Sequence, residues 1–260
     1  MNGIENTTLM FETLTELVPE IRAARADPQR ALPDLNQVLH KISPLPGSAL
    51  FLGVAGDGLP VLLNLEDPIP GPVLIAGDPG SGKTHQLQVI AQATADNHDP
   101  EHLRYAVITS KTKEWERFEH SENCEGILSF QQPLTTNYLA SLVEWAHSNK
   151  DGGQFIVLMI DGLEALNADP DLQEAFRWLL LRGPSRRVWP IVTLTADHLS
   201  TTNQWLPAFR TRLCGNIAPV KDVTLLTGAT DYSFGDLLAG SQLAMREGKE
   251  WVPYWLPRIN

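Results

Sequence analysis

The chain has 260 residues, 43% of them hydrophobic, and a formal net charge of −11. That apolar content suffices for a substantial core and excludes a disordered protein, while the acidic balance gives no support for nonspecific binding to nucleic acid or anionic membranes. The two cysteines, Cys124 and Cys214, form no disulfide framework or CxxC motif and are typical of free thiols. Without a basic and apolar leader or a membrane-length apolar run, we expect a cytoplasmic protein without a membrane segment.

The first part of the chain is expected to be helical. Apolar residues within Leu14–Ile21, and again within Leu35–Ile42, recur with the spacing of an amphipathic helix. Asp27-Pro28 combines an N-cap residue with proline at the first helical position, which predicts the start of the second helix there. A proline-rich linker follows, and we therefore predict a small N-terminal helical extension over residues 1–46.

From residue 47 to residue 260 the sequence predicts one α/β domain. It begins with a hairpin of Ala49–Val54 and Leu59–Leu63, joined by a glycine-containing turn. Further strands are expected at Val73–Ala76, Tyr105–Thr109, Phe155–Ile160 and Ile191–Thr195. Helices are expected from about Thr84, around Leu139–Ala146 and from Asp169-Pro170. This alternation is typical of a mainly parallel sheet flanked by helices.

The segment between the strand at Val73–Ala76 and the helix after it fits the phosphate-binding pattern GxxxxGK[ST]. Its glycines let backbone N–H groups surround a phosphate chain, and the helix points its positive end at that anion. Lys83 is expected to contact the β- and γ-phosphates of ATP, and the Thr84 hydroxyl to bind Mg²⁺. The predicted nucleotide-binding residues are Gly77, Asp78, Pro79, Gly80, Ser81, Gly82, Lys83, Thr84 and His85. The alternatives are a chance glycine-rich turn or a loop that no longer binds nucleotide.

A second acidic element follows the apolar run Phe155–Ile160, which leads into Asp161. A carboxylate at the carboxyl end of a buried parallel strand is where P-loop enzymes hold Mg²⁺, so we predict that Asp161 is a metal-site and catalytic residue rather than a plain strand cap. The next residue is Gly162, where many ATPases carry a glutamate that polarises the attacking water. The nearest carboxylate is Glu164, which is our candidate catalytic base; the alternative is a surface glutamate.

Several segments share a family pattern. They are the hairpin at 52–65, the strand and P-loop at 72–84, and weaker matches at Tyr105–Lys111, Trp189–Thr195, Leu206–Ile217 and, faintly, Gly235–Arg246. Together they resemble the motor domain of the FtsK/SpoIIIE branch of the FtsK–HerA ATPases. The resemblance implies a RecA-like P-loop NTPase that uses ATP and Mg²⁺ in a homo-oligomeric ring or a larger ATPase assembly. It also implies double-stranded DNA as a partner, which the net charge does not support.

The chain departs from that family at three positions. Gly162 replaces the glutamate, Ala196 stands at the sensor glutamine, and Thr109 replaces the first aspartate of its strand. These departures resemble the degenerate modules of type VII secretion motors and indicate weak or altered hydrolysis. The resemblance also implies that Arg212 enters a neighbouring subunit's site as a catalytic arginine.

The arginine cluster of Arg182, Arg186 and Arg187 is a second source for such a group, unless it is a solvated or phosphate-binding face. We therefore predict an ATP-Mg²⁺-binding P-loop ATPase. The alternative is a non-hydrolysing scaffold or regulatory module of a DNA-translocating or secretion assembly. A structural adaptor with a relict loop is disfavoured because Lys83, Thr84 and Asp161 are intact.

Overall fold

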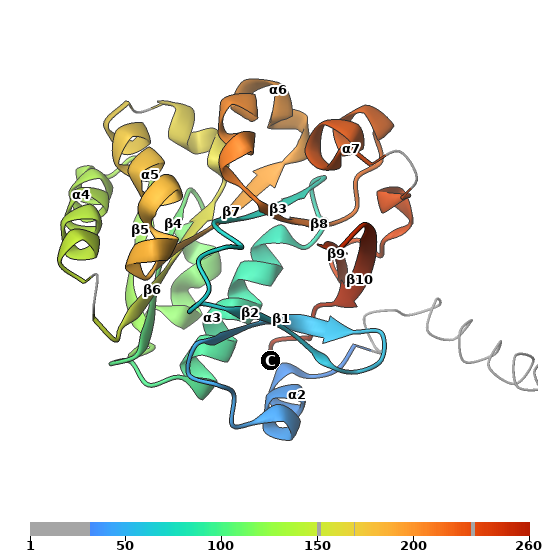
Figure 1. The fold of residues 1–260 in the computed structure, drawn as a ribbon, viewed down its shortest axis with the longest axis horizontal. Coiled ribbons are helices and arrows are strands. Elements are labelled where there is room, and N and C mark those ends of the chain that lie inside the picture. Colours follow the sequence, from blue (N-terminus) through green and yellow to red (C-terminus); the bar gives the residue numbers. More distant parts are fainter. Residues whose placement is uncertain (1–31, 150–151, 169, 230–231) are drawn as a thin grey trace, which may run out of the picture.

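The computed structural model describes residues 32–149, 152–168, 170–229 and 232–260, and Figure 1 shows its fold. Within these ranges, ten strands form one sheet in the order β2-β1-β10-β9-β8-β3-β7-β6-β4-β5. The strands are β1 (Ala49–Ala55), β2 (Pro60–Asn64), β3 (Val73–Gly77), β4 (Leu103–Thr109), β5 (Cys124–Ser129), β6 (Phe155–Asp161), β7 (Val188–Thr195), β8 (Thr211–Cys214), β9 (Gln242–Glu247) and β10 (Glu250–Trp255).

The helices lie between and outside these strands. The α-helices are α2 (Leu35–Ile42), α3 (Lys83–Asn97), α4 (Pro133–Ser148), α5 (Pro170–Arg182), α6 (Leu199–Thr202) and α7 (Val220–Thr227). The 3₁₀ helices are η1 (Thr112–Phe118), η2 (Leu163–Ala168), η3 (Pro184–Arg186), η4 (Ala196–His198), η5 (Asn203–Ala208) and η6 (Phe234–Asp236). No helix in the described part of the chain is long and apolar enough to cross a membrane.

The sheet has a parallel and an antiparallel part. Strands β8, β3, β7, β6, β4 and β5 pair in parallel, whereas β9, β10, β1 and β2 add antiparallel strands at one side. The expected mainly parallel sheet with flanking helices is therefore confirmed. The expected hairpin is formed by β1 and β2. The closing hairpin is formed by β9 and β10, further along the chain than the faint match at Gly235–Arg246.

The core is built on both faces of the parallel strands. In β3, Leu74 and Ala76 pack in the cluster that includes α4 and α5, whereas Val73 and Ile75 pack in the cluster that includes α3 (Figure 1). All four side chains are fully buried. A strand covered on both faces needs apolar residues at every position, which explains why such strands are continuous apolar runs in the sequence.

Helix α2 begins later than the sequence predicted. It starts at Leu35, with the Asp34 carboxylate accepting a hydrogen bond from the backbone N–H of Gln37 at 3.2 Å, rather than at Asp27-Pro28. An aspartate N-cap satisfies one of the free N–H groups of the first turn, and here Asp34 fills that place. The predicted first helix and Asp27-Pro28 themselves lie outside the described residues. The division of the chain at residue 46 stays a prediction.

The parallel strands place four chain segments at one sheet edge. Gly77 at the end of β3 lies in register with Thr195 of β7, and Asp161 at the end of β6 pairs with Thr193 on one side and Thr109 of β4 on the other. The carboxyl ends of β3, β7, β6 and β4 therefore meet, and ligands of open parallel sheets bind at this edge.

Candidate functional site

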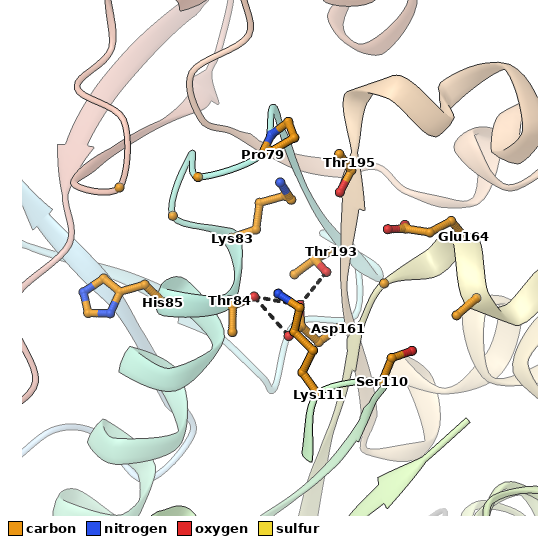
Figure 2. Close-up of a pocket in the computed structure, with 15 residues that line it drawn as sticks. Pro79, Lys83, Thr84, His85, Ser110, Lys111, Asp161, Glu164, Thr193 and Thr195 are labelled. Carbon is orange, nitrogen blue, oxygen red and sulfur yellow. Dashed lines mark hydrogen bonds between the residues drawn. The ribbon is translucent and has the colours of Figure 1, made fainter. Parts of the chain in front are cut away.

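A cavity of about 540 Å³ lies at this edge of the sheet, and Figure 2 shows the side chains around it. It is lined by Pro79, Gly80, Gly82, Lys83, Thr84, His85, Ser110, Lys111, Asp161, Gly162, Glu164, Ala165, Thr193, Thr195 and Gly240. One wall is the loop between β3 and α3, and the other comes from the segments after β4, β6 and β7. The cavity thus brings together Lys83, Thr84, Asp161 and Glu164, which the sequence analysis selected separately.

The loop between β3 and α3 needs its glycines for two physical reasons. Gly80 and Gly82 have φ of 78° and 101°, in the left-handed region that favours glycine. A Cβ atom on Gly77 would lie 2.3 Å from the Ser81 Oγ, and one on Gly82 would lie 3.2 Å from the backbone of Gly240. The turn is therefore too tight for larger residues, and Gly240, from just before β9, closes over the first turn of α3.

The Lys83 ammonium is folded back onto its own loop. Its Nζ donates to the carbonyl oxygens of Gly77 at 3.0 Å and Asp78 at 2.8 Å. Burial lowers the pKa of Lys83, and the negative charges of Glu164, Asp161 and Asp78 oppose this effect. Both acceptors are neutral carbonyls, so a phosphate oxygen would be a stronger acceptor for the same ammonium.

A carboxylate and two hydroxyls form the floor of the cavity. Thr84 Oγ1 donates to both Asp161 oxygens, at 3.1 and 3.0 Å, and Thr193 Oγ1 donates to Asp161 Oδ1 at 2.9 Å (Figure 2). These hard oxygen atoms suit Mg²⁺. Among the described residues no group of three or more His, Cys, Asp or Glu side chains is arranged to hold a metal. The residues present therefore fit an ion that takes only part of its ligands from protein, as Mg²⁺ does beside phosphates.

Glu164 lies at the start of η2 and lines the same cavity. Its Oε2 atom is buried and has no hydrogen-bond partner. A buried carboxylate oxygen without a donor is costly, so this atom is placed to accept a bond from a molecule that enters the cavity. The preceding Gly162 has φ of 118°, which explains why that position is not a glutamate in this chain.

Three other predicted nucleotide-binding residues serve partly structural roles. The Asp78 Oδ2 accepts the backbone N–H of Ala218 at 2.8 Å, which ties the loop to the segment after β8. The Ser81 hydroxyl is buried without a partner. The His85 ring points away from Asp161, and its Nε2 lies 2.9 Å from the carbonyl oxygen of Pro257 (Figure 2). Burial lowers the pKa of His85.

Arg212 does not line this cavity. Its guanidinium donates to the carbonyl oxygens of Phe209 at 3.3 Å, Leu206 at 2.8 Å and Leu226. These bonds fasten β8 to η5 and α7 within one chain. A role for Arg212 in a neighbouring subunit stays a prediction.

In the other arginine cluster, Arg182 ends α5, and Arg186 and Arg187 come just before β7. The amino end of β7 lies at the sheet edge opposite the cavity. There Arg187 pairs with Glu66 at 3.5 Å, and Arg186 donates to the carbonyl of His147 at 3.4 Å.

Sequence patterns did not identify the lining residues Ser110, Lys111, Ala165, Thr193, Thr195 and Gly240. Lys111 ends the segment that matched the family pattern at Tyr105–Lys111, which was a signal that the strand end was near the site. Gly240 had no local signal, because only the tertiary fold brings it against Gly82. The position of the expected sensor glutamine, Ala196, is buried and presents no polar side-chain atom.

Comparison with solved structures shows the same fold in several ATPases. EssC (ATPases 2 and 3) from Geobacillus thermodenitrificans is 14% identical, with a TM-score of 0.67 over 84% of this chain and 48% of its own. The cytoplasmic domain of the Thermomonospora curvata type VII secretion ATPase EccC is 18% identical, with a TM-score of 0.68 over 87% of this chain and 32% of its own. The chain thus spans less than half the length of these two structures.

The pCW3 conjugation coupling protein TcpA, in its monomer form with ATPγS, is 15% identical, with a TM-score of 0.67 over 88% of this chain and 70% of its own. These are FtsK/SpoIIIE-like ATPase domains, and the likeness shows a shared α/β P-loop NTPase fold. No curated protein matches the chain. The NACHT domain family model matches residues 71–216, from before β3 to just after β8. That match covers more than half of this chain, so the chain belongs to the NACHT domain family.

Proposed function

We propose that this chain binds ATP with Mg²⁺ in the cavity at the end of β3 and acts as an FtsK/SpoIIIE-like ATPase with weak or altered hydrolysis. The observation that carries the proposal is the arrangement of Lys83, Thr84 and Asp161. A phosphate-binding loop, an ammonium and a Thr84–Asp161 oxygen pair lie within one cavity of about 540 Å³, a size suited to a nucleotide.

Each of these residues has a defined part in binding. The backbone N–H groups of the glycine-rich loop and the first turn of α3 surround the phosphates, and Lys83 exchanges its carbonyl partners for phosphate oxygens. Thr84 and Asp161 hold Mg²⁺, which neutralises charge on the phosphates when it is bound. Thr193 keeps the Asp161 carboxylate oriented through its 2.9 Å hydrogen bond.

Hydrolysis depends on a group that orients a water molecule toward the terminal phosphate. The unpartnered Oε2 of Glu164 supports that residue as the water-orienting base, in place of the missing glutamate at position 162. General-base catalysis of this kind contributes on the order of 10²–10⁴-fold to a rate. Because Ala196, just after β7, offers no polar side-chain atom in place of the family's glutamine, the cavity has fewer groups that contact the terminal phosphate, so slow turnover is expected.

The second candidate function is a nucleotide-binding scaffold or regulatory module in a larger assembly. The similar structures include the cytoplasmic domain of a type VII secretion ATPase and a conjugation coupling protein, and these similarities support a homo-oligomeric ring or a multi-ATPase assembly in the cytoplasm. In such an assembly Arg212 is our candidate for contact with the neighbouring site. The net charge of −11 favours a protein over double-stranded DNA as its partner.

Turnover measurements separate the two functions. The wild type and Glu164→Gln are assayed for ATP hydrolysis with Mg²⁺, with and without double-stranded DNA. Slow turnover that falls on Glu164→Gln supports the ATPase, and binding without turnover supports the scaffold. DNA-stimulated turnover would contradict the preference for a protein partner. Turnover unchanged by Glu164→Gln would contradict the assignment of the base.

A further inference from the structure

Lys111 lies on the cavity wall opposite the phosphate-binding loop. It follows β4, whose last residue Thr109 is in register with Asp161. The Thr109 hydroxyl accepts the backbone N–H of Lys111 at 3.0 Å, and this local turn fixes the direction of the chain after the strand. Figure 2 shows the Lys111 side chain extending toward Thr84 and Asp161. The Lys111 side chain therefore lies at the same sheet edge as the phosphate-binding loop.

In the described part of the chain this ammonium pairs with an exposed carboxylate. Lys111 Nζ lies 3.3 Å from Glu114 Oε1, and the two side chains are 66% and 47% exposed. Pairs so exposed contribute little to stability, so a phosphate oxygen can displace the carboxylate. The segment itself is fixed, because the Gln88 side chain of α3 donates to the Glu114 carbonyl oxygen at 2.9 Å. The ammonium can change partners without a backbone movement.

Three basic side chains line the cavity in the described part of the chain, Lys83, His85 and Lys111. Of the basic side chains that line it, Lys83 belongs to the loop and the ring of His85 is directed at Pro257. That leaves Lys111 as the lining cation that faces the loop across the cavity.

We propose that Lys111 is a specificity-determining residue that distinguishes nucleoside triphosphate from diphosphate. In the free protein its ammonium pairs with Glu114, and in the triphosphate complex it leaves Glu114 and contacts the terminal phosphate. In this way the segment after β4 supplies a contact to the terminal phosphate that Ala196, which follows β7, cannot make. The inference rests on the proposed nucleotide binding and adds the residue that selects the ligand.

The test compares affinities for two nucleotides rather than activity. Calorimetric titration with ATPγS and with ADP, both with Mg²⁺, gives Kd values for the wild type, Lys111→Met, Lys111→Arg and Glu114→Gln. Lys113→Met is the matched control, because Lys113 is an exposed lysine two residues further on, in η1, and does not line the cavity. Circular dichroism checks that each variant is folded.

We expect Lys111→Met to weaken ATPγS binding by about tenfold and to leave the Kd for ADP within about twofold, since one charge-assisted hydrogen bond is lost. Lys111→Arg retains most of the affinity. Glu114→Gln has the opposite effect and tightens ATPγS binding by about two- to fivefold, because the competing carboxylate is removed. The Lys113→Met protein binds both nucleotides like the wild type.

Two results would overturn the inference while leaving the proposed function intact. One is a Lys111→Met protein that binds ATPγS as tightly as the wild type, which would mean that Lys111 is a solvated surface residue. The other is equal weakening for ATPγS and ADP, which would mean a general electrostatic effect. A wild type that binds neither nucleotide would instead contradict the proposed function itself.

Discussion

The two walls of the cavity differ in how completely they match a P-loop ATPase. On the loop wall, Lys83 and the glycines have the geometry that phosphate binding requires, and Thr84 already contacts Asp161. The opposite wall lacks the glutamate and glutamine of the family pattern, at Gly162 and Ala196, and its polar side chains include Ser110, Lys111, Glu164, Thr193 and Thr195. In the proposed function, binding and hydrolysis therefore depend on different parts of one site, and one can persist while the other changes.

The largest effect is expected on the loop wall, from Lys83→Ala. Removing the ammonium takes away a charged contact to the phosphates, so ATPγS affinity should fall by about a hundredfold or more. Calorimetric titration measures the loss, and Lys249→Ala, at an exposed lysine, is the control. Binding retained within a few fold would show that the loop is not the phosphate site.

The same lysine gives a prediction about stability and pH. Burial lowers the pKa of Lys83, so between its folded pKa and its unfolded value of 10.5 the unfolded chain binds more protons. The free energy of unfolding of the nucleotide-free protein should therefore rise with pH across that window, and less so for Lys83→Met. Denaturant titrations at several alkaline pH values compare the two proteins. An identical pH slope for both would contradict this account of the buried charge.

On the opposite wall the strongest effect is expected from Glu164→Gln. If Glu164 orients the attacking water, turnover should fall by about a hundredfold while the Kd for ATPγS changes by less than about threefold. Single-turnover hydrolysis with the wild type as reference measures the rate. A parallel loss of affinity would mean that Glu164 contributes to binding rather than to the chemical step.

Asp161 lies between the two walls, and Asp161→Asn should mainly weaken the binding of Mg²⁺. Loss of its charge removes an oxygen ligand suited to Mg²⁺, so the gain in ATPγS affinity on adding Mg²⁺ should shrink by about tenfold. Titrations with Mg²⁺ and with EDTA give this gain for Asp161→Asn and for Asp197→Asn, whose side chain is exposed and off the cavity. An unchanged Mg²⁺ dependence would exclude Asp161 as a metal-site residue.

The smallest change is expected from an attempt to restore the missing glutamate. Gly162→Glu forces a side chain into a backbone conformation with φ of 118° and should destabilise the protein by about 1–3 kcal/mol without raising turnover. Gly153→Glu is the control, because a Cβ atom there meets nothing and its φ is not in the left-handed region. Denaturant unfolding compares the two. A Gly162→Glu protein that is as stable as the wild type and hydrolyses ATP faster would contradict the expected backbone strain at position 162.

Sequence patterns predicted the parts of the fold that are locally encoded. Strands β3, β4, β6 and β7 were expected because burial on both faces demands apolar runs. Strands β5 and β8 were not, since the six residues CEGILS and the four residues TRLC are too short or too polar to show that pattern. In β10, Pro253 weakens the strand signal. These strands depend on neighbours that lie far away in the sequence.

The residues of the site fall into the same two groups: those that a local sequence pattern identifies and those that only tertiary contacts bring to the cavity. The loop is one continuous segment, so its spacing was sufficient to identify it. Lys111 and Gly240 reach the cavity only because parallel pairing and the turn before β9 bring them there. A family pattern identified Arg212 as a candidate. That pattern could not predict that three carbonyl groups of the same chain bind its guanidinium. Local spacing identifies local sites, whereas tertiary contacts decide the role of separate residues.

The central claim is that the cavity binds ATP with Mg²⁺. Calorimetric titration of the wild-type protein with ATPγS, in Mg²⁺ and then in EDTA, tests it most directly. The account predicts saturable binding at one site per chain, with a Kd below about 1 mM in Mg²⁺ and weaker binding in EDTA. Absence of binding at millimolar ATPγS in Mg²⁺ would contradict it.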